Sequence, residues 1–262
     1  MNKELASLEI NGTRKVDGGE YSDVEINGFG RILGDLKCGD FSCNGKGTVK
    51  GNLEAGDIDV NGAASFRGDV TADELEVNGS TSIYGDFKAD HTVVNGRLDL
   101  RQKADIERLR VQGYCRVEGE LRGGHFEVNG QLHVEEDCTC DRFDGHGRFV
   151  IDGLLSAETI DIGLFWHSKA REIGGHSVKI FKRENLLSKI ASAVHMVFSK
   201  KNIRLDVDVI EADEIEISDT KAKIVRGQNV MIGENCEIEL LEYSGTFEQH
   251  ETAKIKEVKQ LS

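Results

Sequence analysis

Apolar residues recur in pairs two positions apart, and the pairs return at a constant interval, as Val60, Val77 and Val94 show. One unit has the full arrangement, with inward pairs at Ile58 and Val60, Ala64 and Phe66, and Val70 and Ala72. A spacing of two is that of a β-strand, in which alternate side chains face the same side. The pattern therefore predicts three short strands in each unit, with two inward side chains on each strand.

Each predicted strand recurs one unit later with the same residue character. Leu75 and Val77 occupy the places that Ile58 and Val60 hold in the preceding unit. Hairpins would instead join neighbouring strands in antiparallel order. The expected fold is all-β: a parallel β-helix, or β-solenoid. It is built from triangular coils of 17 residues, the interval from Val60 to Val77.

An Asn-Gly pair marks one corner of most units. Glycine is expected there because a Cβ would point inward at the corner, and asparagine because it tolerates left-handed backbone and bonds to nearby backbone groups. Stacked asparagine side chains are also expected to form a ladder from coil to coil. The predicted corner ladder consists of Asn27, Gly28, Asn44, Gly45, Asn61, Gly62, Asn78, Gly79, Asn95, Gly96, Asn129 and Gly130.

The strand pattern is interrupted over residues 182–201, where apolar residues follow helical spacing. The predicted element is one amphipathic helix, with five basic residues and one acidic residue. Three interpretations stay open: a helix packed on the flank or end of the solenoid, a peripheral contact with an anionic membrane, or a filament contact. The apolar face would be formed by Leu187, Ile190, Val194, Val197 and Phe198.

Inward pairs resume after this segment with looser spacing. They are expected at Ile215 and Ile217, Ala222 and Ile224, Val230 and Ile232, and Cys236 and Ile238. The predicted organisation is a regular β-helix of about ten coils over 7–181, the basic helix over 182–201, and less regular coils with a tail over 202–262.

Composition and charge narrow the classes of function. The formal charge of the 262-residue chain is −14, which argues against nucleic acid as a partner. The chain shows neither an apolar signal core nor a stretch long enough to span a membrane, so a cytoplasmic location is expected. All six cysteines fall on inward positions, where they read as small buried hydrophobes. The histidines are scattered, so no catalytic residue, cofactor site or metal site is predicted.

Two stretches resemble the bactofilins, bacterial polymer-forming cytoskeletal proteins. One is "GDVTADELEVNGSTSIYGDFKADHTVVNG" (68–96), and "DVIEADEIEISDTKAKIVRGQNVMIGENCEIELLEYSG" (208–245) is similar to a segment of bacillus-type members. The resemblance implies a right-handed β-helix that assembles into filaments without nucleotide. It also implies a scaffold role in cell shape, motility or protein localisation, with copies of itself or other bactofilin-like chains as partners.

A self-assembling structural scaffold is therefore the leading hypothesis. The open sheet edges of a solenoid favour further pairing. Only "MNKELA" precedes the first coil, so Leu8 and Ile10 are the candidate assembly end. Two alternatives remain: an acyltransferase of the left-handed β-helix type, suggested by "VMIGENCEI" (230–238), and a solenoid that binds partners without polymerising.

Overall fold

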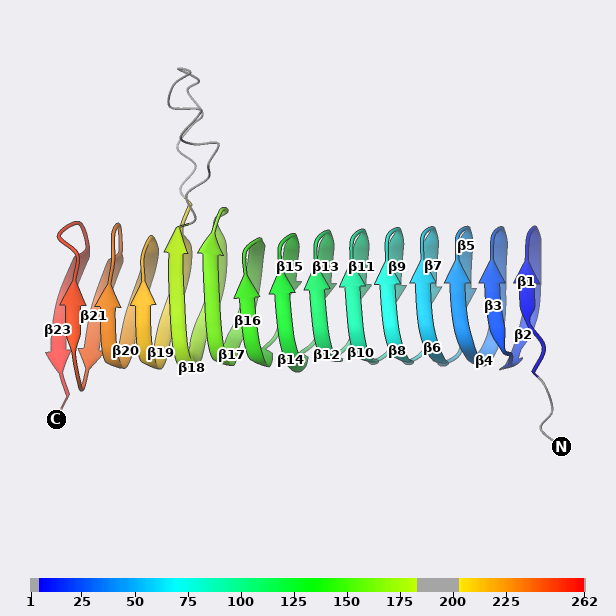
Figure 1. The fold of residues 1–262 in the computed structure, drawn as a ribbon, viewed down its shortest axis with the longest axis horizontal. Helices are drawn as coiled ribbons and strands as arrows, with labels where there is room; N and C mark the ends of the chain where they lie inside the picture. The colour runs from blue at the N-terminus through cyan, green and yellow to red at the C-terminus, as the bar shows by residue number, and fades with distance from the viewer. Residues whose placement is uncertain (1–4, 183–202, 262) are drawn as a thin grey trace, which may run out of the picture. The chain divides into compact units, whose positions relative to one another are not determined.

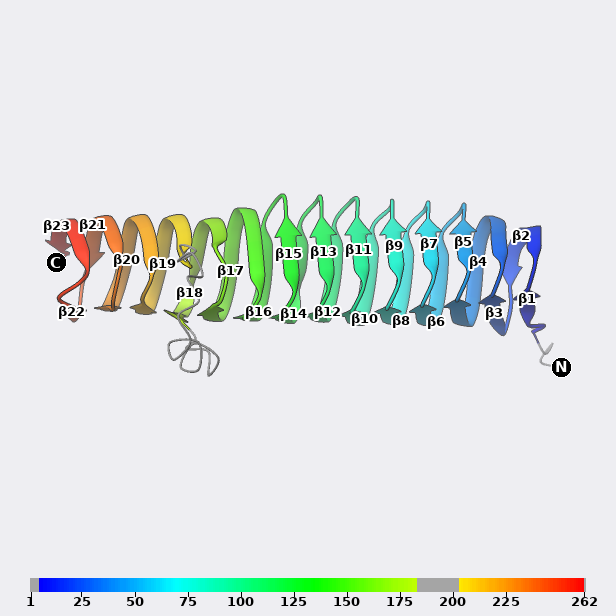
Figure 2. The ribbon, with the colours of Figure 1, turned by 90° about the horizontal axis from the view of Figure 1, so that it is seen from above.

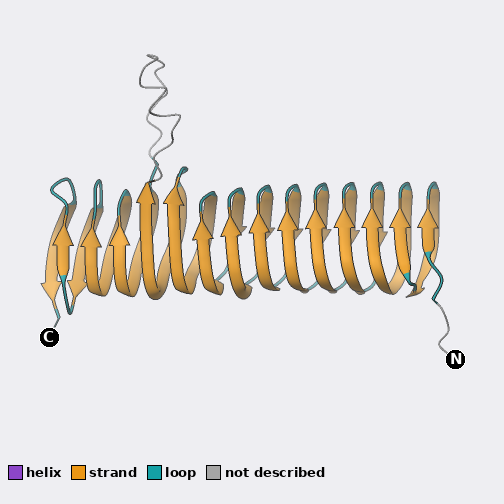
Figure 3. Ribbon diagram, in the orientation of Figure 1, coloured by secondary structure: helices purple, strands orange, loops and turns teal. Residues whose placement is uncertain are grey.

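The structure, a computed structural model, describes residues 5–182 and 203–261. These residues form strands and connecting loops, and none of them lies in a helix (Figure 3). Two compact units divide the chain, unit 1 at Met1–Cys138 and unit 2 at Thr139–Ser262. The boundaries expected from the sequence, 7–181, 182–201 and 202–262, stay predictions.

Unit 1 is a stack of parallel turns, in which shorter and longer strands alternate from β5 onward (Figures 1 and 2). Its strands are β1 (Leu8–Ile10), β2 (Thr13–Glu20), β3 (Asp23–Ile26), β4 (Phe29–Cys43), β5 (Lys46–Val49), β6 (Leu53–Val60), β7 (Ala63–Phe66), β8 (Val70–Val77), β9 (Ser80–Ile83), β10 (Phe87–Val94), β11 (Arg97–Leu100), β12 (Ala104–Val111), β13 (Tyr114–Val117), β14 (Leu121–Val128) and β15 (Gln131–Val134).

Strands pair with their equivalents one turn away, and the register follows the sequence period. Leu53 of β6 lies beside Val70 of β8, and Ala63 of β7 lies beside Ser80 of β9, each pair separated by one period of the sequence. The pairing is parallel throughout. The prediction of an all-β parallel β-helix is confirmed.

From β5 to β15 each turn of unit 1 contains two strands and not the three expected, and β4 runs through the positions of all three. The longer strand carries two of the predicted inward pairs, because it continues through a bend. In β6 the inward residues are Leu53 and Ala55, then Ile58 and Val60, and the outward residues between them are Gly56 and Asp57. Bending a strand shifts its inward phase while the ladder of backbone hydrogen bonds continues on either side.

The inward columns of unit 1 form its core. Phe41, Phe66, Phe87 and Phe126 are all buried, and the rings of Phe41 and Phe66 meet edge to face at 5.4 Å. Stacking one turn on the next buries every inward side chain against its equivalents in the neighbouring turns. A turn with few apolar residues therefore still contributes to a continuous, well-packed core.

Unit 2 has longer strands, several of which run through most of a turn. They are β16 (Cys138–Gly145), which begins at the boundary residue, β17 (Arg148–Leu164), β18 (Ser168–Lys182), β19 (Leu205–Ile217), β20 (Thr220–Ile232), β21 (Glu237–Tyr243), β22 (Phe247–Gln249) and β23 (Lys254–Gln260). The pairing is again parallel, but the turn length varies. Glu237 lies beside Lys254, one full sequence period on, whereas the step from Leu205 to its neighbour Thr220 is shorter.

The segment 183–202 is inserted between two adjacent turns of unit 2. β18 and β19 pair directly from Ser168 beside Leu205 to Ile180 beside Ile217. Lys182 is the last residue of β18. The rest of the predicted helix, including Leu187, Ile190, Val194, Val197 and Phe198, lies outside the described residues. The helix stays a prediction.

One predicted inward pair in unit 2 is wrong. Ala222 is buried, but Ile224 is only half-buried, and Val225 takes the inward place. The bend of β20 falls between them, so the alternation changes phase by one residue. An alternation counted by two along the sequence does not register such a bend. It therefore assigns the residue after the bend to the wrong side of the strand.

Candidate functional site

The asparagine corner forms a hydrogen-bonded column along unit 1. The side-chain amide of each asparagine donates to the side-chain oxygen of the one a turn earlier, at 2.8 to 3.1 Å. The column runs through Asn11, Asn27, Asn44, Asn61, Asn78 and Asn95. Gln112 follows in the sequence period, and Asn129 donates instead to Glu127 at 2.7 Å.

The glycines of this corner allow adjacent turns to approach closely. A Cβ on Gly62 would lie 2.1 Å from the carbonyl oxygen of Gly45 and 2.5 Å from that of Asn44. The contact is with backbone of the preceding turn, so the expected clash with the core is the wrong reason for glycine here. The same close approach recurs in the other glycines of the column, Gly28, Gly45, Gly79, Gly96 and Gly130.

The expected left-handed backbone at the asparagines is also absent. In the described part of the chain, the non-glycine residues with left-handed φ are Asp219 and Asn235. The corner instead holds its shape by pairing with the turn before it. The backbone N–H groups of Asn61 and Gly62 both donate to the carbonyl oxygen of Cys43, at 3.0 and 2.9 Å.

A second column, at the other corner, carries a role that sequence reasoning missed. The side-chain oxygen of Asp35 accepts a hydrogen bond from the backbone N–H of Asn52, one turn on, at 2.8 Å. The side-chain oxygen of Asn52 accepts in the same way from the backbone N–H of Asp69, and that of Asp69 accepts from the backbone N–H of Asp86, both at 2.9 Å. The signal was the recurrence of Asp or Asn directly after a second series of glycines, at Gly34, Gly51, Gly68 and Gly85. These side chains satisfy backbone donors that would otherwise lack a partner at the corner.

The candidate assembly end, Leu8 and Ile10, lies in the first turn with its side chains inward. Leu8 is 8% exposed and Ile10 is 1% exposed. β1 pairs with β3, and no other described strand lies on its outer side. Arg14 of β2 holds the inward register position, beside the buried Gly30, yet it is exposed. The open part of this turn is therefore its backbone edge, next to an arginine.

In unit 2, β23 exposes an apolar edge. β23 pairs with β21, where Val258 continues the column of the buried Leu241. Val258 is 44% exposed, and Leu261, just after the strand, is 40% exposed. Among the described strands none covers the other side of β23. At this edge, the column of inward residues that is buried elsewhere in unit 2 is exposed to solvent.

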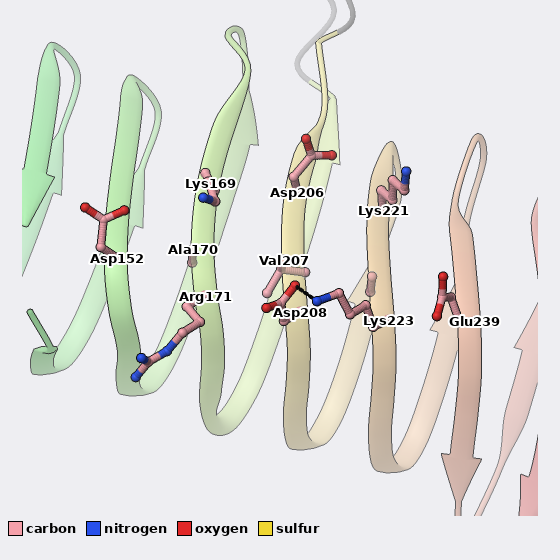
Figure 4. Close-up of a pocket in the computed structure, with 11 residues that line it drawn as sticks. Asp152, Lys169, Ala170, Arg171, Asp206, Val207, Asp208, Lys221, Lys223 and Glu239 are labelled. Atoms are coloured by element: carbon pink, nitrogen blue, oxygen red, sulfur yellow. Dashed lines mark ion pairs between the residues drawn. The ribbon is translucent and has the colours of Figure 1, made fainter. Parts of the chain in front are cut away.

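A shallow hollow of about 460 Å³ lies on the outer surface of unit 2 across β18, β19 and β20 (Figure 4). Charges alternate from strand to strand around it. Asp208 pairs with Lys223 at 2.8 Å, and Asp206 lies between Lys169 and Lys221 in the register. Opposite charges therefore neutralise one another within the fold, and the hollow carries no surplus charge to attract a ligand.

The cysteines are buried thiols, several with a raised pKa. All six cysteines are free and buried, and burial raises the pKa of Cys38 and Cys236 to about 11 and that of Cys115 to about 12. Thiols of such high pKa are poor nucleophiles at neutral pH. Within residues 5–182 and 203–261, no group of three His, Cys, Asp or Glu side chains is arranged to hold a metal ion.

The "VMIGENCEI" segment (230–238) joins β20 to β21, and its cysteine is buried. The structure brings His250 next to it, with a ring nitrogen 3.9 Å from Glu234. The other ring nitrogen of His250 lies within hydrogen-bonding distance of the hydroxyl and backbone N–H of Thr252. His250 therefore closes the turn between β22 and β23.

The described part of the chain also holds no helix of the length and apolar character that crossing a membrane requires.

Comparison with known proteins finds one family and two relatives. Residues 4–88 match the family model for bactofilin, described as polymer-forming cytoskeletal. The chain is 37% identical over 107 residues to the uncharacterized protein YhbE of Bacillus subtilis, covering 40% of this chain and 42% of that protein. It is 35% identical over 106 residues to the uncharacterized protein YhbF of the same organism, covering 40% of each. The chain thus spans about two fifths of the length of these relatives, and no solved structure matches it.

Proposed function

We propose that the protein, whose residues 4–88 match the bactofilin family model, is a structural scaffold that assembles with copies of itself without nucleotide. The observation that carries the proposal is the apolar edge of β23, where Val258 extends a core column into solvent. An exposed strand edge with apolar side chains is a template for pairing with another chain.

Joining through β23 would continue the stack of parallel turns. Its backbone groups would find partners, and Val258 and Leu261 would leave water. Burying apolar surface contributes roughly 25 cal/mol for each Å² removed from water. No nucleotide is needed, because the contact uses the interactions that already hold one turn on the next.

The first turn of unit 1, with Leu8 and Ile10, stays a second proposed joining surface. Its apolar residues are already covered, so its contribution would come from the backbone edge of β1. Arg14 works against this contact, since an inward-facing charge at an edge hinders further pairing. Arg14→Leu would strengthen association if this turn is a joint.

Sedimentation velocity of the purified chain without ATP or GTP tests the proposal, with electron microscopy to show the form of the particles. Wild type is expected to form large particles, and Val258→Lys to reduce their size, because a lysine ammonium at an apolar joint must lose its hydration. The matched control is Glu257→Gln, which makes the same change of charge on the neighbouring, outward-facing residue of β23. Monomeric wild type at high micromolar concentration would contradict the proposal.

Several finer features belong to the same proposal. They are right-handed winding, a triangular cross-section, a cytoplasmic location, and a basic helix over 182–201 that contacts the solenoid or an anionic membrane. The cellular role would be in shape, motility or the placement of other proteins, with other bactofilin-like chains as further partners. The family resemblance supports the winding and the role, and the three inward pairs of each turn support the cross-section.

A further inference from the structure

Charges on the early turns of unit 1 are separated by face. One face, the acidic face, is formed by outward residues of β1, β3, β4, β6 and β8. Its members are Glu9, Asp23, Glu25, Asp40, Asp57, Asp59, Glu74 and Glu76. The other, the basic face, lies beyond the asparagine corner on β2, β4 and β5 and just after β5 and β7. Its members are Lys15, Arg31, Lys46, Lys50 and Arg67.

Like charges of the acidic face lie directly beside one another in the register. Asp23 lies beside Asp40, Asp40 beside Asp57, and Asp57 beside Glu74. Adjacent strands are about 4.8 Å apart, and like charges paired at that spacing destabilise a sheet. Burial, with the neighbouring carboxylates Glu76 and Asp57, raises the pKa of Asp59.

Another column of the same unit avoids this repulsion by alternating sign, since Lys37 lies beside Glu54 and pairs with it. In later turns the column of Asp59 and Glu76 itself continues to Arg110, which pairs with Glu127. On the same column as Lys37, Asp105 lies between Lys88 and Arg122 in the register. The separation of acidic and basic residues onto two faces of the early turns therefore differs from the alternation of charges on the Lys37 column.

On the acidic face, Glu74 lies 3.7 Å from a ring nitrogen of His91, and the basic face contains no such contact among the described residues. Within the described residues, none of its five cations makes an ion pair, although Arg67 lies over the ring of Tyr84 at 4.0 Å. Phe29 lies beside Lys46 in the register and is 62% exposed. Exposed aromatic rings are enriched at protein interfaces.

We propose that the acidic face of one copy of this chain binds the basic face of another, side by side. Both faces occupy the same turns of unit 1, and each presents one row of charges per turn. Two copies therefore match row by row, so each carboxylate row meets a row of cations. An anionic membrane would account for the basic face alone, whereas a second copy accounts for both. This lateral contact does not depend on the end contact through β23.

Charge reversal on each face of the full chain tests the contact. The basic-face variant is Lys46→Glu with Lys50→Glu, and the acidic-face variant is Asp40→Lys with Asp57→Lys. Each variant alone is expected to lose lateral association by at least about tenfold, because its two faces then share one sign. An equimolar mixture of the two is expected to restore it, since each variant again offers the opposite charge to the other.

Matched controls make the same changes of charge on the alternating column: Lys37→Glu with Lys88→Glu, and Glu54→Lys with Asp105→Lys. Circular dichroism confirms that each variant is folded. Particle size is measured by sedimentation velocity, and particle width by electron microscopy, at about 0.05 and 0.5 M salt. The lateral contact is expected to weaken at the higher salt, where screening acts over a few ångströms, while an apolar end contact persists.

Three results would overturn the lateral contact. The first is assembly that is insensitive to salt and to both reversals, which would leave only an end contact. The second is a mixture that fails to restore what the separate variants lose. The third is a basic-face reversal that abolishes binding to vesicles of anionic phospholipid while the acidic-face reversal leaves particle size unchanged, which would assign the basic face to a membrane.

Discussion

The side-chain amide of Asn61 donates a 3.0 Å hydrogen bond to the side-chain oxygen of Asn44, one turn earlier. The bond is possible because the backbone of the two turns approaches closely at Gly62 and Gly45. Each asparagine both donates to one neighbour and accepts from the next, so the column ties successive turns together along the corner. Contacts of this kind couple neighbouring turns and contribute to their cooperative folding.

Gly62→Val is expected to lower the free energy of unfolding by at least about 3 kcal/mol, because the new Cβ would overlap backbone atoms of the preceding turn. Ala63→Val, one residue on, is expected to change it by less than about 1 kcal/mol, since Ala63 faces outward. Chemical denaturation of both variants checks this. Equal losses would contradict the close approach at the corner.

Phe66→Ala is expected to lower the free energy of unfolding by about 3 to 5 kcal/mol, as for other buried aromatic side chains. Phe66 is 1% exposed and packs edge to face with Phe41. Phe29→Ala is the matched control, because Phe29 is 62% exposed and its loss leaves no cavity. Urea titration is the measurement, and a loss below about 1 kcal/mol for Phe66→Ala would place its ring outside the core.

Thr92→Val is expected to raise the free energy of unfolding by about 1 kcal/mol. Thr92 is fully buried between Leu75 and Leu109, and its hydroxyl has no hydrogen-bond partner. Valine keeps the shape and removes the unsatisfied group. Thr71→Val makes the same change at an exposed site and is expected to have little effect. A destabilised Thr92→Val would show that the hydroxyl has a partner, such as a buried water.

Asp59→Asn is expected to raise the melting temperature near neutral pH. The pKa of Asp59 is raised in the folded chain by burial and by the carboxylates around it, so its ionised form opposes folding. That effect is complete above the folded pKa, decreases as the pH falls through it, and disappears below the unfolded pKa. The gain from Asp59→Asn should therefore vanish in acid.

Asp105→Asn is the control for this measurement. Asp105 lies between Lys88 and Arg122, so removing its charge should leave the melting temperature unchanged or slightly lower at neutral pH. Thermal unfolding followed by circular dichroism at several pH values compares the two variants. A gain for Asp105→Asn equal to that for Asp59→Asn would mean that net charge, and not the acidic face, sets the effect.

Much of the fold of unit 1 was accessible from the sequence. Burial alternates along a strand, so inward residues such as Ile58 and Val60 are visible as a local period. Parallel stacking followed from recurrence at a constant spacing, because equivalent residues in register must share one environment. For the same reason, the columns of like and alternating charge can be read once the register is known.

The structure of the corners depends on contacts between turns that are distant in the sequence. The reason for glycine at Gly62 is the carbonyl of Gly45 in the preceding turn, and the role of Asp69 is a backbone N–H in the following turn. Both depend on the distance between turns, which no local pattern encodes. The merging of two short strands into β6 and the phase change at Ile224 likewise depend on where the chain bends. The local sequence pattern therefore specifies which residues face inward along each straight stretch, whereas the packing of one turn on another sets what the bends and corners require.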